Sequence, residues 1–120
     1  MAVRCLIVDD SRAFLEAART LLERGGLTIA GVASTSAEAL RQAETLRPDV
    51  VLVDVSLGDE SGFELARRLV ADHVRAAPVI LISTRSKDDL ADAIAQSPAA
   101  GFLAKSELSA DAIRGLLDGS

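Results

Sequence analysis

Several residue types that mark common protein classes are rare or missing in this 120-residue sequence. Its single cysteine, Cys5, cannot form a disulfide within the chain, so a reducing compartment, the cytoplasm, is expected. Tryptophan and tyrosine are absent and phenylalanine occurs three times, which leaves little on which nucleic acid bases could stack. No apolar run approaches the roughly 20 residues of a membrane-spanning helix, and the first residues lead into a strand-like run rather than a signal peptide. We therefore expect neither nucleic acid nor a membrane as a direct partner.

The charge balance and the length favour one compact, acidic domain. Acidic residues number 18 and basic residues 13, a formal net charge of -5, whereas a nucleic-acid-binding chain is usually basic. The hydrophobic share of 49% and the charged share of 26% are typical of a globular protein. We expect residues 1–120 to form a single domain that buries enough apolar surface to fold without disulfides.

Short apolar runs alternate along the chain with longer amphipathic stretches. The runs predict five strands, at residues 3–8, 27–33, 49–54, 78–83 and 101–104, of which the second is weaker and more exposed than the others. Helical spacing of apolar residues and capping residues predict five helices, after Ser11, at 36–46, after Ser61, at 87–96 and at 110–117. Parallel strands joined by helices form a doubly wound α/β sheet, and ligands bind such sheets at the carboxyl ends of the strands.

Acidic, hydroxyl and basic residues stand at these strand ends. Asp9 and Asp10 follow the first strand, and Asp54 ends the third. Ser83 ends the fourth strand, and Lys105 follows the fifth. In the strand order 2-1-3-4-5 all of them would meet at one edge of the sheet. Carboxylates so close oppose each other's ionisation unless a cation lies among them, and an all-oxygen ligand set suits Mg²⁺.

This combination of residues is suited to phosphoryl chemistry. Mg²⁺ with open coordination positions typically binds phosphate oxygens, and a carboxylate can attack phosphorus to give an aspartyl phosphate. Asp54 stands alone on a central strand and is the candidate nucleophile, with Lys105 and the Ser83 hydroxyl stabilising charge on the phosphoryl group. Each residue taken alone also has a structural interpretation, as a turn residue, a helix cap or a solvated side chain.

The motifs that carry this pattern are similar to those of the receiver domain of bacterial response regulators. They are Val8-Asp9-Asp10-Ser11, Val53-Asp54-Val55 with Gly62, Ile82-Ser83-Thr84 and Phe102-Leu103-Ala104-Lys105. The resemblance covers essentially the whole chain and implies a flavodoxin-like fold with five parallel strands and five helices. It also implies that Asp54 is the phosphoacceptor, that a histidine kinase is the phosphodonor and that Mg²⁺ is the cofactor. Apart from catalysing its own phosphorylation and dephosphorylation, such a chain is not an enzyme.

The resemblance assigns a role to each remaining site residue. Asp10 is implied as the direct metal ligand, Asp9 as an acidic partner acting largely through water, and the main-chain carbonyl of Ser56 as a further ligand. Ser83 is implied to turn toward the phosphoryl group, and Phe102 to follow it inward. The surface of the last two helices and the fifth strand would then bind a downstream protein. A phosphorylation-dependent homodimer is a further partner that we expect. We expect a stand-alone receiver rather than an excised fragment.

Two positions depart from the family pattern. Gly58 stands where many receivers have a proline, which predicts a looser loop. Ser106 replaces the proline that usually follows the lysine, which predicts a trans peptide bond at that position.

Two other functions remain as alternatives. One is a Mg²⁺-dependent phosphohydrolase that works through an aspartyl phosphate, and the other is an interaction module that is never phosphorylated. A flavin carrier is disfavoured, because the chain has no aromatic pair to enclose the ring. Cys5 is expected to be a buried small hydrophobe, and the only histidine, His73, a surface residue.

Overall fold

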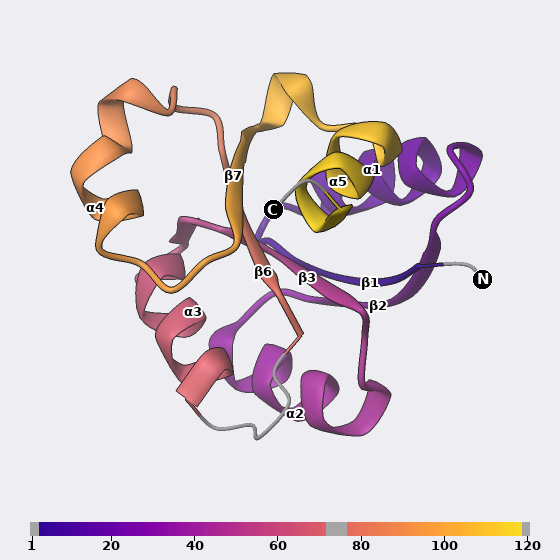
Figure 1. Ribbon diagram of the computed structural model, residues 1–120. Helices are drawn as coiled ribbons and strands as arrows, with labels where there is room; N and C mark the ends of the chain where they lie inside the picture. The colour runs from indigo at the N-terminus through magenta and orange to yellow at the C-terminus, as the bar shows by residue number, and fades with distance from the viewer. Residues whose placement is uncertain (1–2, 72–76, 119–120) are drawn as a thin grey trace.

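A parallel sheet covered by helices on both faces makes up the computed structural model, which describes residues 3–71 and 77–118 (Figure 1). The sheet has five strands in the order β2-β1-β3-β6-β7. These strands are β1 (Arg4–Val8), β2 (Thr28–Ala33), β3 (Val50–Asp54), β6 (Val79–Ser83) and β7 (Gly101–Ala104). Since β4 and β5 form a separate hairpin, the predicted order 2-1-3-4-5 and the doubly wound fold are confirmed.

Helices cover the sheet on both sides and enclose two apolar clusters. The helices are α1 (Arg12–Arg24), α2 (Ser36–Leu46), α3 (Gly62–Ala71), α4 (Ala91–Ala95) and α5 (Ala110–Asp118). Leu6 and Val8 of β1 pack on the side of α2 and α3, whereas Cys5 and Ile7 pack on the side of α1 and α5. Strands buried on both faces need apolar side chains at every position, which is why they appear in the sequence as continuous apolar runs.

Side-chain caps decide where the first two helices begin. The Ser11 hydroxyl accepts a hydrogen bond from the Phe14 N–H at 3.2 Å, and the Thr35 hydroxyl accepts one from the Glu38 N–H at 3.2 Å. Each cap satisfies a backbone donor that has no partner inside the helix. Phe14, whose N–H donates to this cap, lies in the first turn of α1.

Two segments differ from the sequence prediction. The helix expected at 87–96 is a 3₁₀ turn, η1 (Asp88–Leu90), followed by the five-residue α4. Asp is a poor residue for a helix interior, and among the residues of η1 and α4 only Leu90 is buried, so packing does little to extend the helix. Around Gly58, where the sequence predicts a looser loop, β4 (Ser56–Leu57) and β5 (Glu60–Ser61) pair as an antiparallel hairpin. Gly58 has a φ of 59°, which is typical of the tight turns between such strands.

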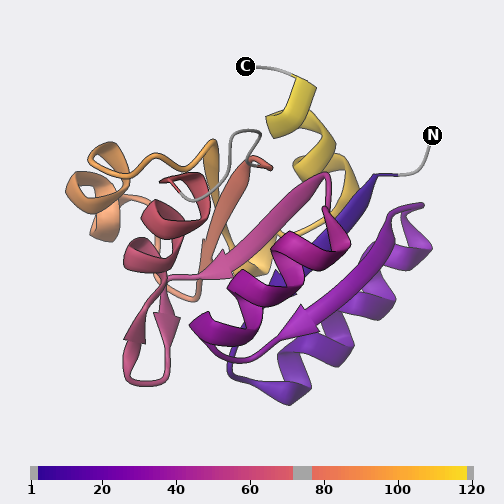
Figure 2. The ribbon, with the colours of Figure 1, turned by 90° about the horizontal axis from the view of Figure 1, so that it is seen from below.

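The hairpin projects from the edge of the sheet at which β3 ends (Figure 2). The chain after β7 continues into a second 3₁₀ turn, η2 (Lys105–Glu107). No peptide bond within 3–71 and 77–118 is cis, so the trans bond predicted before Ser106 is confirmed. His73 lies outside the described residues. In the part of the chain that the structure describes, no helix has the length and apolar character needed to span a bilayer.

Candidate functional site

Three carboxylates meet at the carboxyl ends of β1 and β3. Asp9 and Asp10 follow β1 directly, and Asp54 is the last residue of β3. One oxygen from each of them lies within 4.8 Å of the others. Asp9 is fully buried, Asp54 is 7% exposed and Asp10 is exposed. The structure therefore brings the three acids together, as the pairing of β1 with β3 requires.

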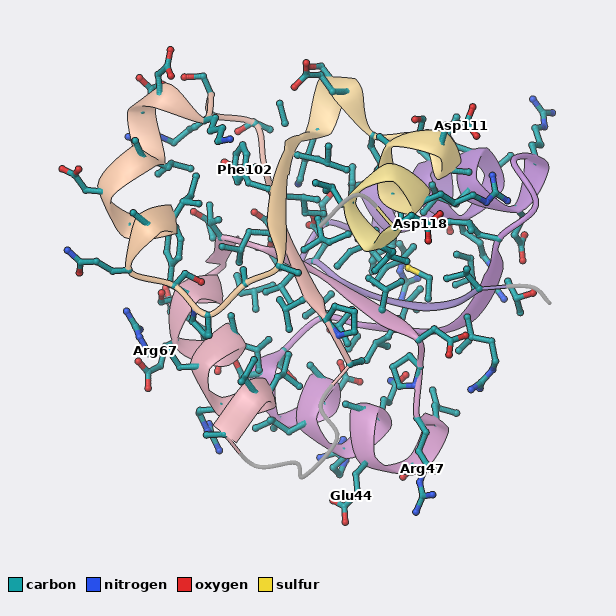
Figure 3. The ribbon with its side chains drawn as sticks, in the orientation of Figure 1. Glu44, Arg47, Arg67, Phe102, Asp111 and Asp118 are labelled. Atoms are coloured by element: carbon teal, nitrogen blue, oxygen red, sulfur yellow. The ribbon has the colours of Figure 1, made fainter. Side chains whose placement is uncertain are left out.

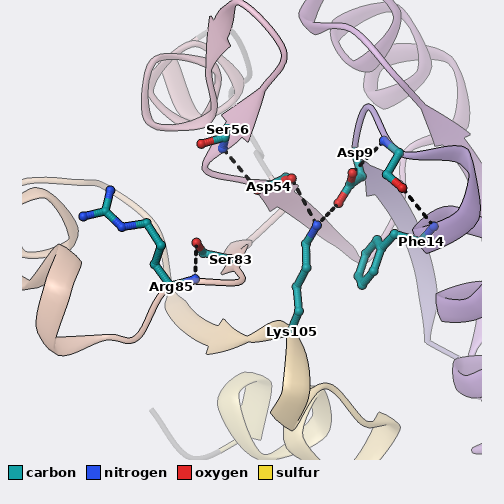
Figure 4. A network of polar contacts seen from close by, with 8 residues as sticks. Asp9, Phe14, Asp54, Ser56, Ser83, Arg85 and Lys105 are labelled. Atoms are coloured by element: carbon teal, nitrogen blue, oxygen red, sulfur yellow. Dashed lines mark hydrogen bonds and ion pairs between the residues drawn. The ribbon is translucent and has the colours of Figure 1, made fainter.

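Lys105, the first residue of η2, reaches this acidic cluster from β7 (Figure 4). Its Nζ lies 2.6 Å from Oδ2 of Asp9 and 3.2 Å from Oδ2 of Asp54. Burial alone would lower the pKa of Lys105, but the hydrogen bond and charge of Asp9 and the charge of Asp54 outweigh it and raise that pKa. The lysine is therefore held as an ammonium between two carboxylates.

Asp54 is under opposing electrostatic influences. Burial raises the pKa of its carboxyl group, and the nearby charge of Asp9 raises it further. The Ser56 N–H, which donates to Oδ1 at 3.1 Å, and Lys105 act in the other direction, but the net shift of the pKa is upward. The ionised form of Asp54 therefore gains from any additional positive charge at this site.

The two oxygens of Asp9 have different partners. Its Oδ1 accepts a hydrogen bond from the Ser11 N–H at 2.8 Å. Its Oδ2 is fully buried and faces the Lys105 ammonium at 2.6 Å. The three carboxylates and one ammonium carry a formal charge of -2. An oxygen-only donor set with two surplus negative charges, one of whose carboxylates (Asp10) is exposed, fits a hard divalent cation such as Mg²⁺.

Ser83 and Phe102 lie on the two strands beyond Asp54. Ser83 is buried at the end of β6, where its hydroxyl accepts a hydrogen bond from the Arg85 N–H at 3.0 Å. Phe102 of β7 is partly exposed and packs on the side of the sheet that α2, α3 and α4 cover (Figure 3). The hydroxyl and the ring thus lie on strands adjacent in the sheet, where Ser83 pairs with Ala104 and Leu81 with Phe102.

The sequence prediction missed the part that Phe14 plays at this site. The centre of its ring lies 4.1 Å from Nζ of Lys105, a cation–π contact on the side of the ammonium away from Asp54 (Figure 4). The periodicity of α1 indicated only that Phe14 faces the core. Its place one turn after the Ser11 cap was the available signal, because that turn lies beside the end of β1.

An open groove of about 480 Å³ lies beside Asp10. It runs between the first turns of α1 and the connection from β2 to α2, and Arg12, Arg19, Ser34 and Glu38 are among its lining residues. Asp10, which lines this groove, is exposed, whereas Asp9 is fully buried and Asp54 is nearly so.

A family model matches nearly the whole chain. The model of the response regulator receiver domain matches residues 5–117. Among curated proteins, the response regulator GacA of Pseudomonas viridiflava is 33% identical over 104 residues, which cover 86% of this chain and 48% of GacA. The chain spans about half the length, or less, of the curated relatives that it matches.

Solved structures match the chain over almost its full length. The signal receiver domain of a modulated diguanylate cyclase from Desulfovibrio desulfuricans G20 has a TM-score of 0.81 and 32% identity, with 99% of this chain and 93% of that chain covered. A response regulator protein from Burkholderia pseudomallei has a TM-score of 0.80 and 25% identity, with 97% of this chain and 66% of that chain covered. The structure of the latter contains a phosphorylated aspartic acid, a calcium ion and citrate.

Proposed function

Because the chain belongs to the family of response regulator receiver domains of two-component systems, we propose that Asp54 accepts a phosphoryl group from a partner histidine kinase, with Mg²⁺. The resemblance identified from the motifs is confirmed by this membership. The observation that carries the proposal is the contact of Asp54 with Lys105 beside Asp9 and Asp10. The phosphorylated aspartic acid in the relative from Burkholderia pseudomallei supports it.

The chemical step requires a carboxylate oxygen of Asp54 to reach phosphorus. That oxygen forms the new O–P bond while the P–N bond to the donor histidine breaks, and the imidazole leaves with the electron pair and takes up a proton. Lys105 stabilises the charge on the phosphoryl oxygens, because its ammonium already lies 3.2 Å from Oδ2 of Asp54. The Ser56 N–H, which donates to Oδ1, keeps the carboxylate in a fixed orientation.

The metal site consists of residues at the same edge of the sheet. Asp10, Asp54 and the Ser56 carbonyl would hold Mg²⁺, with Asp9 acting largely through water. When bound, Mg²⁺ supplies positive charge that neutralises the phosphoryl oxygens. The three carboxylate oxygens within 4.8 Å of one another and the formal charge of -2 support this assignment.

The proposed signal is a change of surface on the side of β6 and β7. The Ser83 hydroxyl turns from the Arg85 N–H toward the phosphoryl oxygens, and Phe102 moves inward into the space that this opens. A downstream protein that binds α4, β7 and α5 then distinguishes the two states, and a phosphorylation-dependent homodimer would use the same surface.

The proposed catalytic role and location of the chain follow from its being a receiver domain. Receiver domains are generally not enzymes, and we propose that this one catalyses only its own phosphorylation and dephosphorylation as a single domain. We place it in the cytoplasm, because its single cysteine, Cys5, is buried and free, as suits a protein of a reducing compartment.

Phosphorylation by a small phosphodonor tests the proposal directly. Incubation with acetyl phosphate and Mg²⁺, followed by intact-mass analysis, should show one added phosphoryl group. Asp54→Ala should show none, whereas Asp49→Ala, which removes an aspartate at the opposite end of β3, should be modified as the wild type is. Lys105→Ala should slow the reaction by roughly 10²-fold or more, the usual effect of losing a group that stabilises transition-state charge. Equal modification of Asp54→Ala and the wild type would exclude Asp54 as the acceptor.

A further inference from the structure

Glu60 of β5 connects the hairpin to the beginning of α2. Its Oε1 accepts a hydrogen bond from the Ser36 N–H at 2.9 Å, although the two residues are 24 positions apart. Ser36 is the first residue of α2 and is buried, so without Glu60 its N–H would be an unpaired donor at a helix terminus. A carboxylate at this place is also stabilised by the helix dipole.

The hairpin borders the acidic cluster at two points. Ser56, which pairs with Ser61 in the hairpin, donates its N–H to Oδ1 of Asp54 at 3.1 Å. At the turn, a Cβ added to Gly58 would lie 3.6 Å from Oδ2 of Asp10, so the backbone of the turn passes close to that carboxylate. Any shift of the hairpin therefore changes the surroundings of two of the three acids.

Few contacts hold a hairpin this small in place. Each of its strands has two residues, and a two-stranded ribbon of that length is not stable by itself. Leu57 is buried and anchors β4 in the apolar cluster, whereas the residues at the turn and in β5 are exposed. Two side-chain hydrogen bonds join β5 to other elements among the described residues: the Ser61 hydroxyl accepts at 3.3 Å from the Glu64 N–H of α3, the helix that follows directly, and Glu60 accepts from the Ser36 N–H of the distant α2.

The segment that precedes α2 is in turn connected to Asp9. The Asp9 N–H donates to the Ala33 carbonyl at the end of β2 at 3.0 Å. The segment that follows is tied to α2 by Glu38, which accepts from both the N–H and the hydroxyl of Ser34 at 2.9 Å. Hydrogen bonds and short stretches of chain thus run from Asp9 through the start of α2 to Glu60, the hairpin and Asp54.

We propose that Glu60 is a positioning residue of the acidic cluster, which holds the hairpin at the distance from Asp10 and Asp54 that Mg²⁺ binding needs. This inference rests on the proposed function, because it assigns Glu60 to the same metal site. Glu60 neither binds the metal nor contacts the phosphoryl group. It acts through the hairpin, whose backbone adjoins both carboxylates.

Mg²⁺ titration of the full chain and of matched variants tests the proposal. Binding is measured by calorimetry, and the initial rate of phosphorylation by acetyl phosphate is measured as a function of Mg²⁺ concentration. Glu60→Ala should weaken Mg²⁺ binding by about tenfold, the lower end of what losing a residue outside the ligand shell costs. Its rate at saturating Mg²⁺ should stay within about twofold of the wild type, because Lys105 and Asp54 are unchanged.

Two controls separate the hydrogen bond from the charge. Asp59→Ala removes the same charge one residue away and should leave Mg²⁺ affinity nearly unchanged. Glu60→Gln should also bind nearly as the wild type does, since its amide oxygen can accept from Ser36. Glu60→Asp keeps the charge on a shorter side chain and should weaken Mg²⁺ binding as Glu60→Ala does. If Glu60→Ala does not fold, Glu60→Asp tests the positioning role in its place.

The possible results have distinct meanings. If Glu60→Asp and Glu60→Ala bind Mg²⁺ no more weakly than Asp59→Ala does, the positioning role is overturned while the proposed function stands. A wild-type chain that neither binds Mg²⁺ nor gains a phosphoryl group would overturn both. A tenfold loss confined to the two variants that break the contact with Ser36 would support the role of Glu60.

Discussion

Asp54 is an ionisable residue whose surroundings favour its protonated form. Burial and the charge of Asp9 raise its pKa above the ordinary value of 3.8, despite the Ser56 N–H and Lys105. Between the ordinary and the raised pKa the folded chain binds more protons than the unfolded chain. Its stability therefore falls as the pH rises through that window, and at neutral pH the ionised Asp54 destabilises the metal-free fold.

Asp54→Asn should accordingly stabilise the metal-free protein at neutral pH. We expect a gain of about 1 kcal/mol, the usual size of a single-residue effect, which corresponds to a rise in Tm of roughly 3–6 °C for a chain of this length. Thermal unfolding in EDTA at several pH values measures it. The gain should disappear as the pH falls below the ordinary pKa of Asp, because the wild-type residue is then protonated in both states. A variant less stable than the wild type at neutral pH would contradict this view of Asp54.

Individual site residues differ in how far the sequence predicts them. Asp9, Asp54 and Lys105 follow from strand ends, because parallel strands place their carboxyl ends together. The contact of Phe14 with Lys105 depends on how a helix is set against a strand, and apolar periodicity cannot distinguish that from ordinary core packing. Glu60 was missed because its partner, Ser36, belongs to a distant element.

At the level of elements, α2 ends in an unusual way. Its C-cap, Arg47, has a left-handed φ of 47°, a conformation that glycine adopts at much lower cost. The Arg47 carbonyl accepts a hydrogen bond from Arg4 Nη1 at 3.0 Å, while its own side chain makes no hydrogen bond or ion pair with the described residues and extends away from the sheet (Figure 3). Arg47 thus stabilises this helix end through its main-chain N–H and carbonyl, and a glycine at this position would provide both groups.

Arg47→Gly should therefore raise the free energy of unfolding by about 0.5–1 kcal/mol, the relief of left-handed strain less the extra entropy of glycine in the unfolded chain. Chemical denaturation measures the change. Arg41→Gly, an exposed position inside the same helix, is the matched control and should lower stability by about 1 kcal/mol. A loss of stability in both variants would show that the Arg47 side chain is needed at the helix end.

Elements with strong apolar patterns were predictable, and those without were not. The continuous apolar runs of β1, β3 and β6 are typical of buried strands, and the sequence predicts all three. The region of η1 and α4 has one buried side chain, Leu90, so neither periodicity nor packing specifies its length. The β4–β5 hairpin has two-residue strands, too short to show an alternating pattern.

For the whole molecule, the site concentrates negative charge in a protein that is acidic overall. The formal charge of -2 at the cluster is part of a net charge of -5 for the chain. A cation that binds only the folded state shifts the unfolding equilibrium by mass action, so Mg²⁺ binding couples directly to the stability of the fold.

Mg²⁺ should thus raise the Tm of the wild type. At a concentration 100 times the Kd the stabilisation is about 2.7 kcal/mol, or roughly 10 °C in Tm. Differential scanning calorimetry over a range of Mg²⁺ concentrations measures it, with NaCl at matched ionic strength to account for screening. Asp10→Asn should lose most of the shift. The same shift with NaCl would mean that screening, and not a bound ion, is responsible.

The proposed reactive edge of the sheet is assembled from three segments that lie far apart in the sequence. Asp54 and Lys105 are 51 residues apart, and Asp9 lies near the amino terminus. Under the proposed function, a nascent polypeptide would become an efficient acceptor only after the ribosome has released the segment around Lys105. Partly synthesised chains would be modified slowly, because the ammonium that contacts Asp54 would still be missing.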